Sequence, residues 1–120
     1  MLHPDRWLGE TMGEVRNVSD SEFNDTVNET EWVIVDFWAP WCAPCKAIGP
    51  VLEAVAQERE ILVAKVDTEQ NTSTAAQLGV RSIPALFMYR NGTVVSQKTG
   101  SMPKPKLLAW IDEVMTADDF

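Results

Sequence analysis

The chain has 120 residues and a mass of 13.4 kDa; 45% of its residues are apolar and 23% are charged, which predicts one folded domain rather than a disordered chain. Its formal charge of −8 disfavours binding to nucleic acid and to anionic lipid surfaces. No uncharged apolar run approaches the ~18 residues of a membrane-spanning helix, and no secretory signal is visible, so a cytoplasmic location is expected.

Residues 1–13 are expected to form a flexible N-terminal extension, and residues 14–120 the folded domain. In chain order the first predicted elements are a strand at 15–18, a helix at about 20–29, a strand at 32–38, a helix at 42 to about 59 and a strand at 61–66. A helix capped by Asp67 or Thr68 and ending at Gly79 follows. The last elements are strands at 85–89 and 93–98 and a helix capped by Ser101 with Pro103 in its first turn.

Three local signals support this order. Ser19 and Glu22 form the capping box of the first helix. The β-branched and aromatic run over 32–38 predicts a central strand that is buried on both faces, as in a parallel sheet. Asn91-Gly92 predicts a type I′ hairpin turn. We therefore expect an α/β fold in which parallel crossovers place helices on both faces of one sheet and the hairpin adds an antiparallel edge.

The two cysteines, Cys42 and Cys45, are too few for the disulfide framework of a small secreted domain, and a bridge between them would close too small a loop to stabilise the fold. They lie where a buried strand meets a helix. The helix N-terminus would stabilise a thiolate on Cys42, and Cys45 would lie one turn further along, within reach of a disulfide. Pro44 fits the first helical turn. The pair is therefore interpreted as a redox dithiol.

The alternative for a Cys-x-x-Cys pair is half of a metal site. A tetrahedral zinc site needs four ligands, and the chain offers only His3 besides the two sulfurs, so metal binding would need a second subunit. No metal and no other bound cofactor are expected.

Asp36 falls inside the buried strand, where burial should raise its pKa and make it a candidate proton acceptor for a thiol. Lys65 on the next strand could tune it, and the alternative is a purely structural Asp36–Lys65 ion pair. Pro84 begins a later strand, and the sequence leaves open whether the Ile83–Pro84 bond is cis or trans.

Together, Trp-Ala-Pro-Trp-Cys-Ala-Pro-Cys-Lys, the upstream Val-Asp-Phe, the Ile-Pro pair and the Asn-Gly hairpin ending at Gly100 resemble the thioredoxin family over about residues 14–116. The resemblance implies the thioredoxin fold, a three-layer α/β/α sandwich around a mixed five-stranded sheet in the order βαβαβαββα.

It also implies residue roles. Cys42 resembles the attacking thiol, Cys45 the resolving thiol, Asp36 the proton acceptor and Lys65 the residue that tunes it. Pro84 resembles the family's cis-proline. The implied substrate-docking residues are Trp41, Ala43, Pro44, Ile83, Pro84 and Gly100. For Trp41 and Ile83, the alternative is a place in the core.

The implied function is reduction of disulfides in target proteins by a monomeric protein, with a thioredoxin reductase as electron donor. Two rivals remain. One is a disulfide oxidant or isomerase, which the dipeptide Ala43-Pro44 disfavours because it lacks a histidine. The other is a non-catalytic binding or chaperone module, which the presence of both cysteines and Asp36 disfavours.

Overall fold

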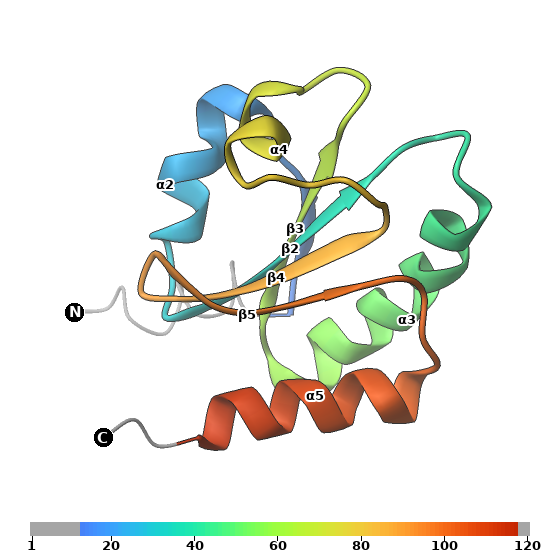
Figure 1. The fold of residues 1–120 in the computed structure, drawn as a ribbon. Helices are drawn as coiled ribbons and strands as arrows, with labels where there is room; N and C mark the ends of the chain where they lie inside the picture. Colours follow the sequence, from blue (N-terminus) through green and yellow to red (C-terminus); the bar gives the residue numbers. More distant parts are fainter. Residues whose placement is uncertain (1–12, 118–120) are drawn as a thin grey trace.

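The structure, a computed structural model, describes residues 13–117. It contains one mixed five-stranded sheet with the strand order β1-β3-β2-β4-β5 (Figure 1). The strands are β1 (Val15–Asn17), β2 (Trp32–Trp38), β3 (Leu62–Asp67), β4 (Ala85–Arg90) and β5 (Thr93–Thr99). The helices are the 3-10 helix η1 (Asp20–Glu22) and the α-helices α2 (Phe23–Val27), α3 (Ala43–Arg59), α4 (Ser73–Gln77) and α5 (Lys104–Thr116).

The predicted mixture of strand directions is confirmed. β2 runs parallel to β3 and antiparallel to β4, so it is the central strand of the sheet. β1 is parallel to β3 at one edge, and β5 is antiparallel to β4 at the other. The register places Asp36 of β2 opposite Lys65 of β3 and Leu86 of β4, which puts these three side chains on the same face.

The two faces of the sheet bury two separate apolar cores, because side chains alternate along each strand. In β2, Val35 and Phe37 face α2 and α4, whereas Ile34 packs against α3 and α5. Figure 1 shows these two helix pairs on opposite sides of the sheet, which confirms the three-layer arrangement. Fully burying an aliphatic or aromatic side chain contributes about 1.5–3 kcal/mol, so these cores account for much of the stability.

Two predicted helix starts are wrong. The helix expected from Asp67 or Thr68 begins only at Ser73, because residues 67–71 form a hydrogen-bonded turn. Its N-terminus is capped across the fold: the Asp20 carboxylate accepts hydrogen bonds from the backbone N–H of Ser73 and Thr74, both 3.0 Å, and from the Thr74 hydroxyl at 2.7 Å.

The last helix is not capped by Ser101. Its N-cap residue is Pro103, whose extended backbone suits this position. The Pro103 carbonyl accepts the backbone N–H groups of Lys106 and Leu107, both at 3.1 Å. The first predicted helix is divided into η1 and α2, and the expected pairing at its start is present: the Glu22 carboxylate accepts the backbone N–H of Ser19 at 3.0 Å.

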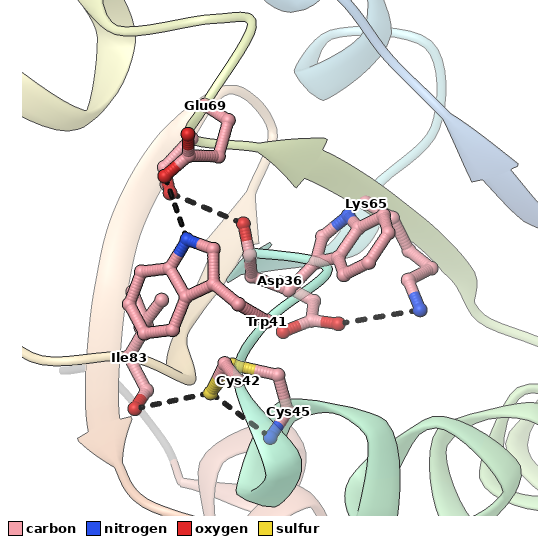
Figure 2. Close-up of a disulfide and its surroundings, with 9 residues drawn as sticks. Asp36, Trp41, Cys42, Cys45, Lys65, Glu69 and Ile83 are labelled. Atoms are coloured by element: carbon pink, nitrogen blue, oxygen red, sulfur yellow. Dashed lines mark hydrogen bonds and ion pairs between the residues drawn. A yellow bond between two sulfur atoms is a disulfide. The ribbon is translucent and has the colours of Figure 1, made fainter.

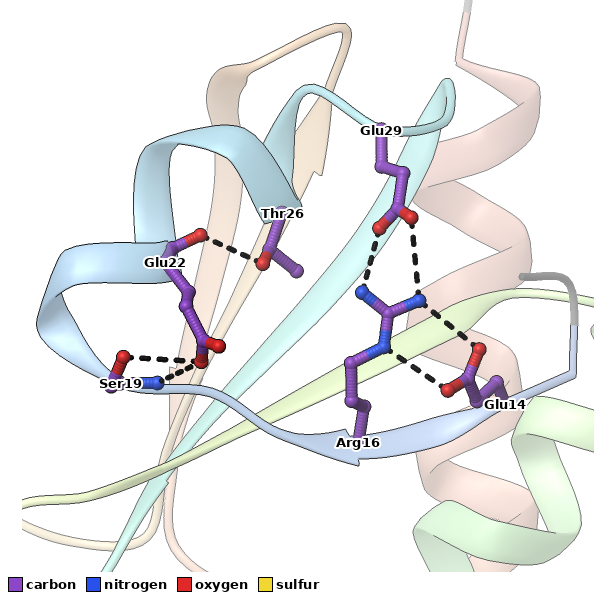
Figure 3. Close-up of polar contacts among 6 residues, drawn as sticks. All are labelled: Glu14, Arg16, Ser19, Glu22, Thr26 and Glu29. Atoms are coloured by element: carbon purple, nitrogen blue, oxygen red, sulfur yellow. Dashed lines mark hydrogen bonds and ion pairs between the residues drawn. The ribbon is translucent and has the colours of Figure 1, made fainter. Parts of the chain in front are cut away.

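Figure 3 shows how the edge strand β1 is tied to the rest of the domain. The Arg16 guanidinium donates to the carboxylate of Glu14 at 3.0 Å and to that of Glu29, in the connection between α2 and β2, at 2.7 Å. These hydrogen bonds raise the pKa of Arg16. Gly13, assigned from sequence to the extension, donates its N–H to the carbonyl of Ile61 at 3.2 Å. Residues 1–12 lie outside the described part of the chain.

The predicted hairpin is confirmed. Asn91 and Gly92 have φ values of 51° and 82°, the left-handed pair that a type I′ turn requires. A Cβ at Gly92 would also meet the end of the exposed Asn28 side chain, which would have to move aside. Within residues 13–117, no helix has the length and apolar character needed to cross a membrane.

Candidate active site

The cysteine pair lies just beyond the carboxyl end of β2, where the chain turns into α3. Cys42 is the N-cap residue of α3 and Cys45 lies in its first turn. The two form a disulfide with a Cα–Cα distance of 5.2 Å, as the spacing predicted. Pro44 occupies the first turn, where its missing N–H leaves no hydrogen bond unmade.

The surroundings of Cys42 favour a sulfur that carries negative charge. Its Sγ accepts the backbone N–H of Cys45 at 3.2 Å, and it lies at the positive end of α3, a helix of 17 residues. After reduction, the same N–H group and helix terminus would stabilise a thiolate. Cys42 retains 5% of its exposure, whereas Cys45 is fully buried, so only Cys42 offers a path to a partner's sulfur.

The loop before β4 covers the disulfide from another side. The Ile83–Pro84 peptide bond is cis, as the resemblance implied. The Ile83 carbonyl oxygen lies 3.8 Å from the Cys42 sulfur, and its side chain packs against the two cysteines. Gly100, at the end of β5, donates its N–H to the Pro84 carbonyl at 2.8 Å. The fold therefore brings residues 42–45, 83–84 and 100 to one place.

Asp36 lies on the face of the sheet covered by α3, two residues before β2 ends. Its side chain is completely buried, and neither carboxylate oxygen has a hydrogen-bond partner. Desolvation raises the pKa of Asp36 from 3.8 to about 7, although the positive charge of Lys65 acts to lower it. Figure 2 shows the carboxylate in the view between the disulfide and Lys65.

Lys65 is close to Asp36 without making a tight ion pair. Its Nζ is 3.9 Å from Asp36 Oδ2, beyond hydrogen-bond distance, and it lies over the ring of Trp38 at 4.8 Å from the centroid. The side chain is 21% exposed and lines a surface cavity of about 380 Å³ together with Trp38 and Asp67. A fully satisfied structural pair, the alternative considered from sequence, is not what the geometry shows.

Trp41 is exposed rather than part of the core. Its side chain keeps 68% of its accessible surface directly beside Cys42, and its Nε1–H donates to Oε2 of Glu69 at 2.7 Å (Figure 2). Ala43 and Pro44 are exposed as well, Ile83 is half-buried and Pro84 is buried. A largely apolar surface lies around Cys42, and we call it the docking rim after the role that the resemblance implies; its members are Trp41, Ala43, Pro44, Ile83 and Gly100.

Sequence reasoning missed Glu69. It lies 28 residues after Trp41, in the turn that follows β3. The predicted strand order could have indicated it. The parallel strands β2 and β3 end at the same edge of the sheet, so the turns that follow them lie close together. Among residues 13–117, no group of three or more His, Cys, Asp or Glu side chains could hold a metal ion; His3 is outside the described residues.

Comparisons with known proteins agree with this geometry. The family model for thioredoxin matches residues 14–113. Thioredoxin from Haemophilus influenzae is 42% identical over 105 residues, which cover 85% of this chain and 98% of that protein. Thioredoxin C-2 from Corynebacterium nephridii is 46% identical over 100 residues, covering 81% and 93%. The structure of a mutant thioredoxin from Halobacterium salinarum superposes with a TM-score of 0.83 at 29% identity, covering 91% of this chain and 97% of that one. The chain therefore belongs to the thioredoxin family of thiol–disulfide oxidoreductases.

Proposed function

We propose that this protein reduces disulfides in target proteins, with Cys42 as the attacking thiolate and Cys45 as the resolving thiol. The main support for this proposal is that the two cysteines differ in their position on α3 and in their exposure. Cys42 sits at the N-cap of α3, retains some exposure and accepts an N–H, whereas Cys45 is fully buried one turn inside the helix. Only the first sulfur can meet a partner, and only the second is positioned to attack the first.

In the first step, the Cys42 thiolate attacks one sulfur of the target disulfide. A mixed disulfide forms between Cys42 and the target, and the second target sulfur leaves as a thiolate that takes a proton from water. In the second step, the Cys45 thiol gives up its proton and attacks the Cys42 sulfur. The bond between Cys42 and the target breaks, the first target sulfur leaves as a thiolate, and the Cys42–Cys45 disulfide forms. Two electrons pass from the pair to the target.

Asp36 is the proposed acceptor of the Cys45 proton, directly or through water. A carboxyl group with a pKa of about 7 is present in both protonation states near neutral pH, which suits a group that takes up and releases a proton in each cycle. Lys65, 3.9 Å away, stabilises the carboxylate and thereby tunes this pKa. The surface cavity beside Lys65 gives the released proton a route towards solvent.

The docking rim is proposed to hold an extended stretch of the target around its disulfide. This surface is exposed and largely apolar, with Trp41 as its largest member. A cavity of about 500 Å³ elsewhere, lined by Trp32 and Trp110 among others, contains none of the proposed site residues. A shallow rim rather than a deep pocket fits a protein substrate recognised mainly by its backbone. Pro84, being buried, would act by shaping the loop.

We further propose a thioredoxin reductase as the donor of two electrons to the oxidised pair, action as a monomer in the cytoplasm, and no bound cofactor. The negative charge of the chain, −8, supports protein targets over nucleic acid or anionic membranes.

The function is tested by the reduction of insulin with dithiothreitol, followed as turbidity with and without the protein. The parent should accelerate the reaction and Cys42→Ser should not. Reduced Cys45→Ser, mixed with insulin after dithiothreitol has been removed, should instead accumulate a mixed disulfide, which is visible as a mass adduct. Acceleration by Cys42→Ser equal to the parent would refute the catalytic function. Equilibration in graded glutathione buffers addresses the oxidant alternative: a pair that remains mostly reduced there would favour it.

A further inference from the structure

Trp41 of the docking rim donates a hydrogen bond to Glu69, and this bond has no role in the proposed reaction. The indole is 68% exposed, so packing alone does not hold it. Its Nε1–H donates to a carboxylate at 2.7 Å, a short charge-assisted bond. Figure 2 shows the indole in the view between the Glu69 carboxylate and the disulfide.

Glu69 is itself held in place. Its backbone N–H donates to Oδ1 of Asp67, at the end of β3, at 2.9 Å. This bond fixes the start of the turn after β3, so the Glu69 side chain leaves the sheet edge from a defined position. A second backbone bond steadies the same turn, in which the Thr68 N–H donates to the Trp38 carbonyl at 2.9 Å. The carboxylate is therefore a constrained negative charge at the edge of the docking rim rather than a freely moving surface group.

We infer that Glu69 is a positioning and specificity-determining residue: it fixes the indole of Trp41 as one wall of the docking rim and favours targets with basic residues flanking their disulfide. The inference rests on the proposed docking role of Trp41. At about 7 Å from Glu69 in water, a lysine would raise the rate of association by a factor of about 2.7 and a glutamate would lower it by the same factor. The two targets should therefore differ by roughly sevenfold through this residue.

The test uses two peptides with the same internal disulfide, one flanked by lysines and one by glutamates. The rate constant for reduction of each by the reduced protein is measured in single turnover at low ionic strength. Glu69→Gln keeps an acceptor for the indole and removes the charge, whereas Glu69→Leu removes both. Glu113→Gln, an exposed residue of α5, is the matched control for net charge. The indole N–H resonance of Trp41, assigned with Trp41→Phe, reports the hydrogen bond.

Glu69→Gln should lower the ratio of the lysine to the glutamate rate constant by roughly sevenfold, and the effect should diminish in 0.5 M salt, where the Debye length falls to about 4 Å. Glu69→Leu should also move the indole resonance and slow both peptides, whereas Glu113→Gln should leave the ratio unchanged. A parent that reduces both peptides with a ratio unaffected by Glu69→Gln would overturn the inference and leave the proposed function standing. A parent that reduces neither peptide would overturn both.

Discussion

Replacing Asp36 with Asn should stabilise the protein, and the gain should depend on pH. In the folded chain the pKa of Asp36 is about 7, against an ordinary value of 3.8. The native state therefore binds more protons than the unfolded chain between these values, so the stability of the parent falls as the pH rises through this window. One pKa unit corresponds to 1.36 kcal/mol, which gives a penalty of ~4 kcal/mol above pH 7 and almost none below pH 4.

The assay is urea unfolding of the oxidised parent and of Asp36→Asn at intervals between pH 4 and pH 8.5. The variant should gain stability over the parent progressively from pH 4 to about pH 7, and the difference should then level off. Asp25→Asn, at an exposed position of α2, is the control, and its difference from the parent should change little with pH. Parallel pH profiles for the parent and Asp36→Asn would show that burial does not perturb this carboxyl group and would refute the reasoning.

Three further predictions concern other residues. Lys65→Met removes the positive charge beside Asp36 and should raise the pKa of that carboxyl further, which would move the pH profile of mixed-disulfide release to higher pH; an unmoved profile would contradict this. Asp20→Ala removes the cap of α4 and should cost about 1 kcal/mol of unfolding free energy, and a loss below about 0.3 kcal/mol would argue against the cap. Ile48→Ala leaves a cavity under α3 and should cost about 2–5 kcal/mol in the same denaturation assay.

Much of the fold could be predicted because its signals are local. The uninterrupted apolar run over 32–38 identified the central strand, since only a strand covered on both faces tolerates such a run. Asn91-Gly92 identified the hairpin because few residue pairs adopt two successive left-handed conformations. The helix over 67–79 was predicted too long, because the turn at 67–71 and the cap from Asp20 depend on contacts that no local pattern contains.

The candidate site divides in the same way. The cysteine spacing predicted the disulfide because residues three apart on a helix share a face, and an acid inside a buried strand predicted a raised pKa from burial alone. The sequence could not predict which of the residues implied for docking are exposed: Trp41 is exposed, whereas Pro84 is buried beneath the docking rim.

The sequence by itself determined the redox pair, the buried acid and the alternation of strands and helices, because each follows from residue types at short spacing. Only the tertiary structure decided that Glu69 accepts a hydrogen bond from the indole of Trp41 and that Lys65 Nζ lies 3.9 Å from Asp36 Oδ2. It also decided that Cys42, and not Cys45, keeps some exposed surface. These features depend on strand register and on turns that meet at one edge of the sheet. Contacts of that kind join residues far apart in the chain and are set by packing rather than by local pattern.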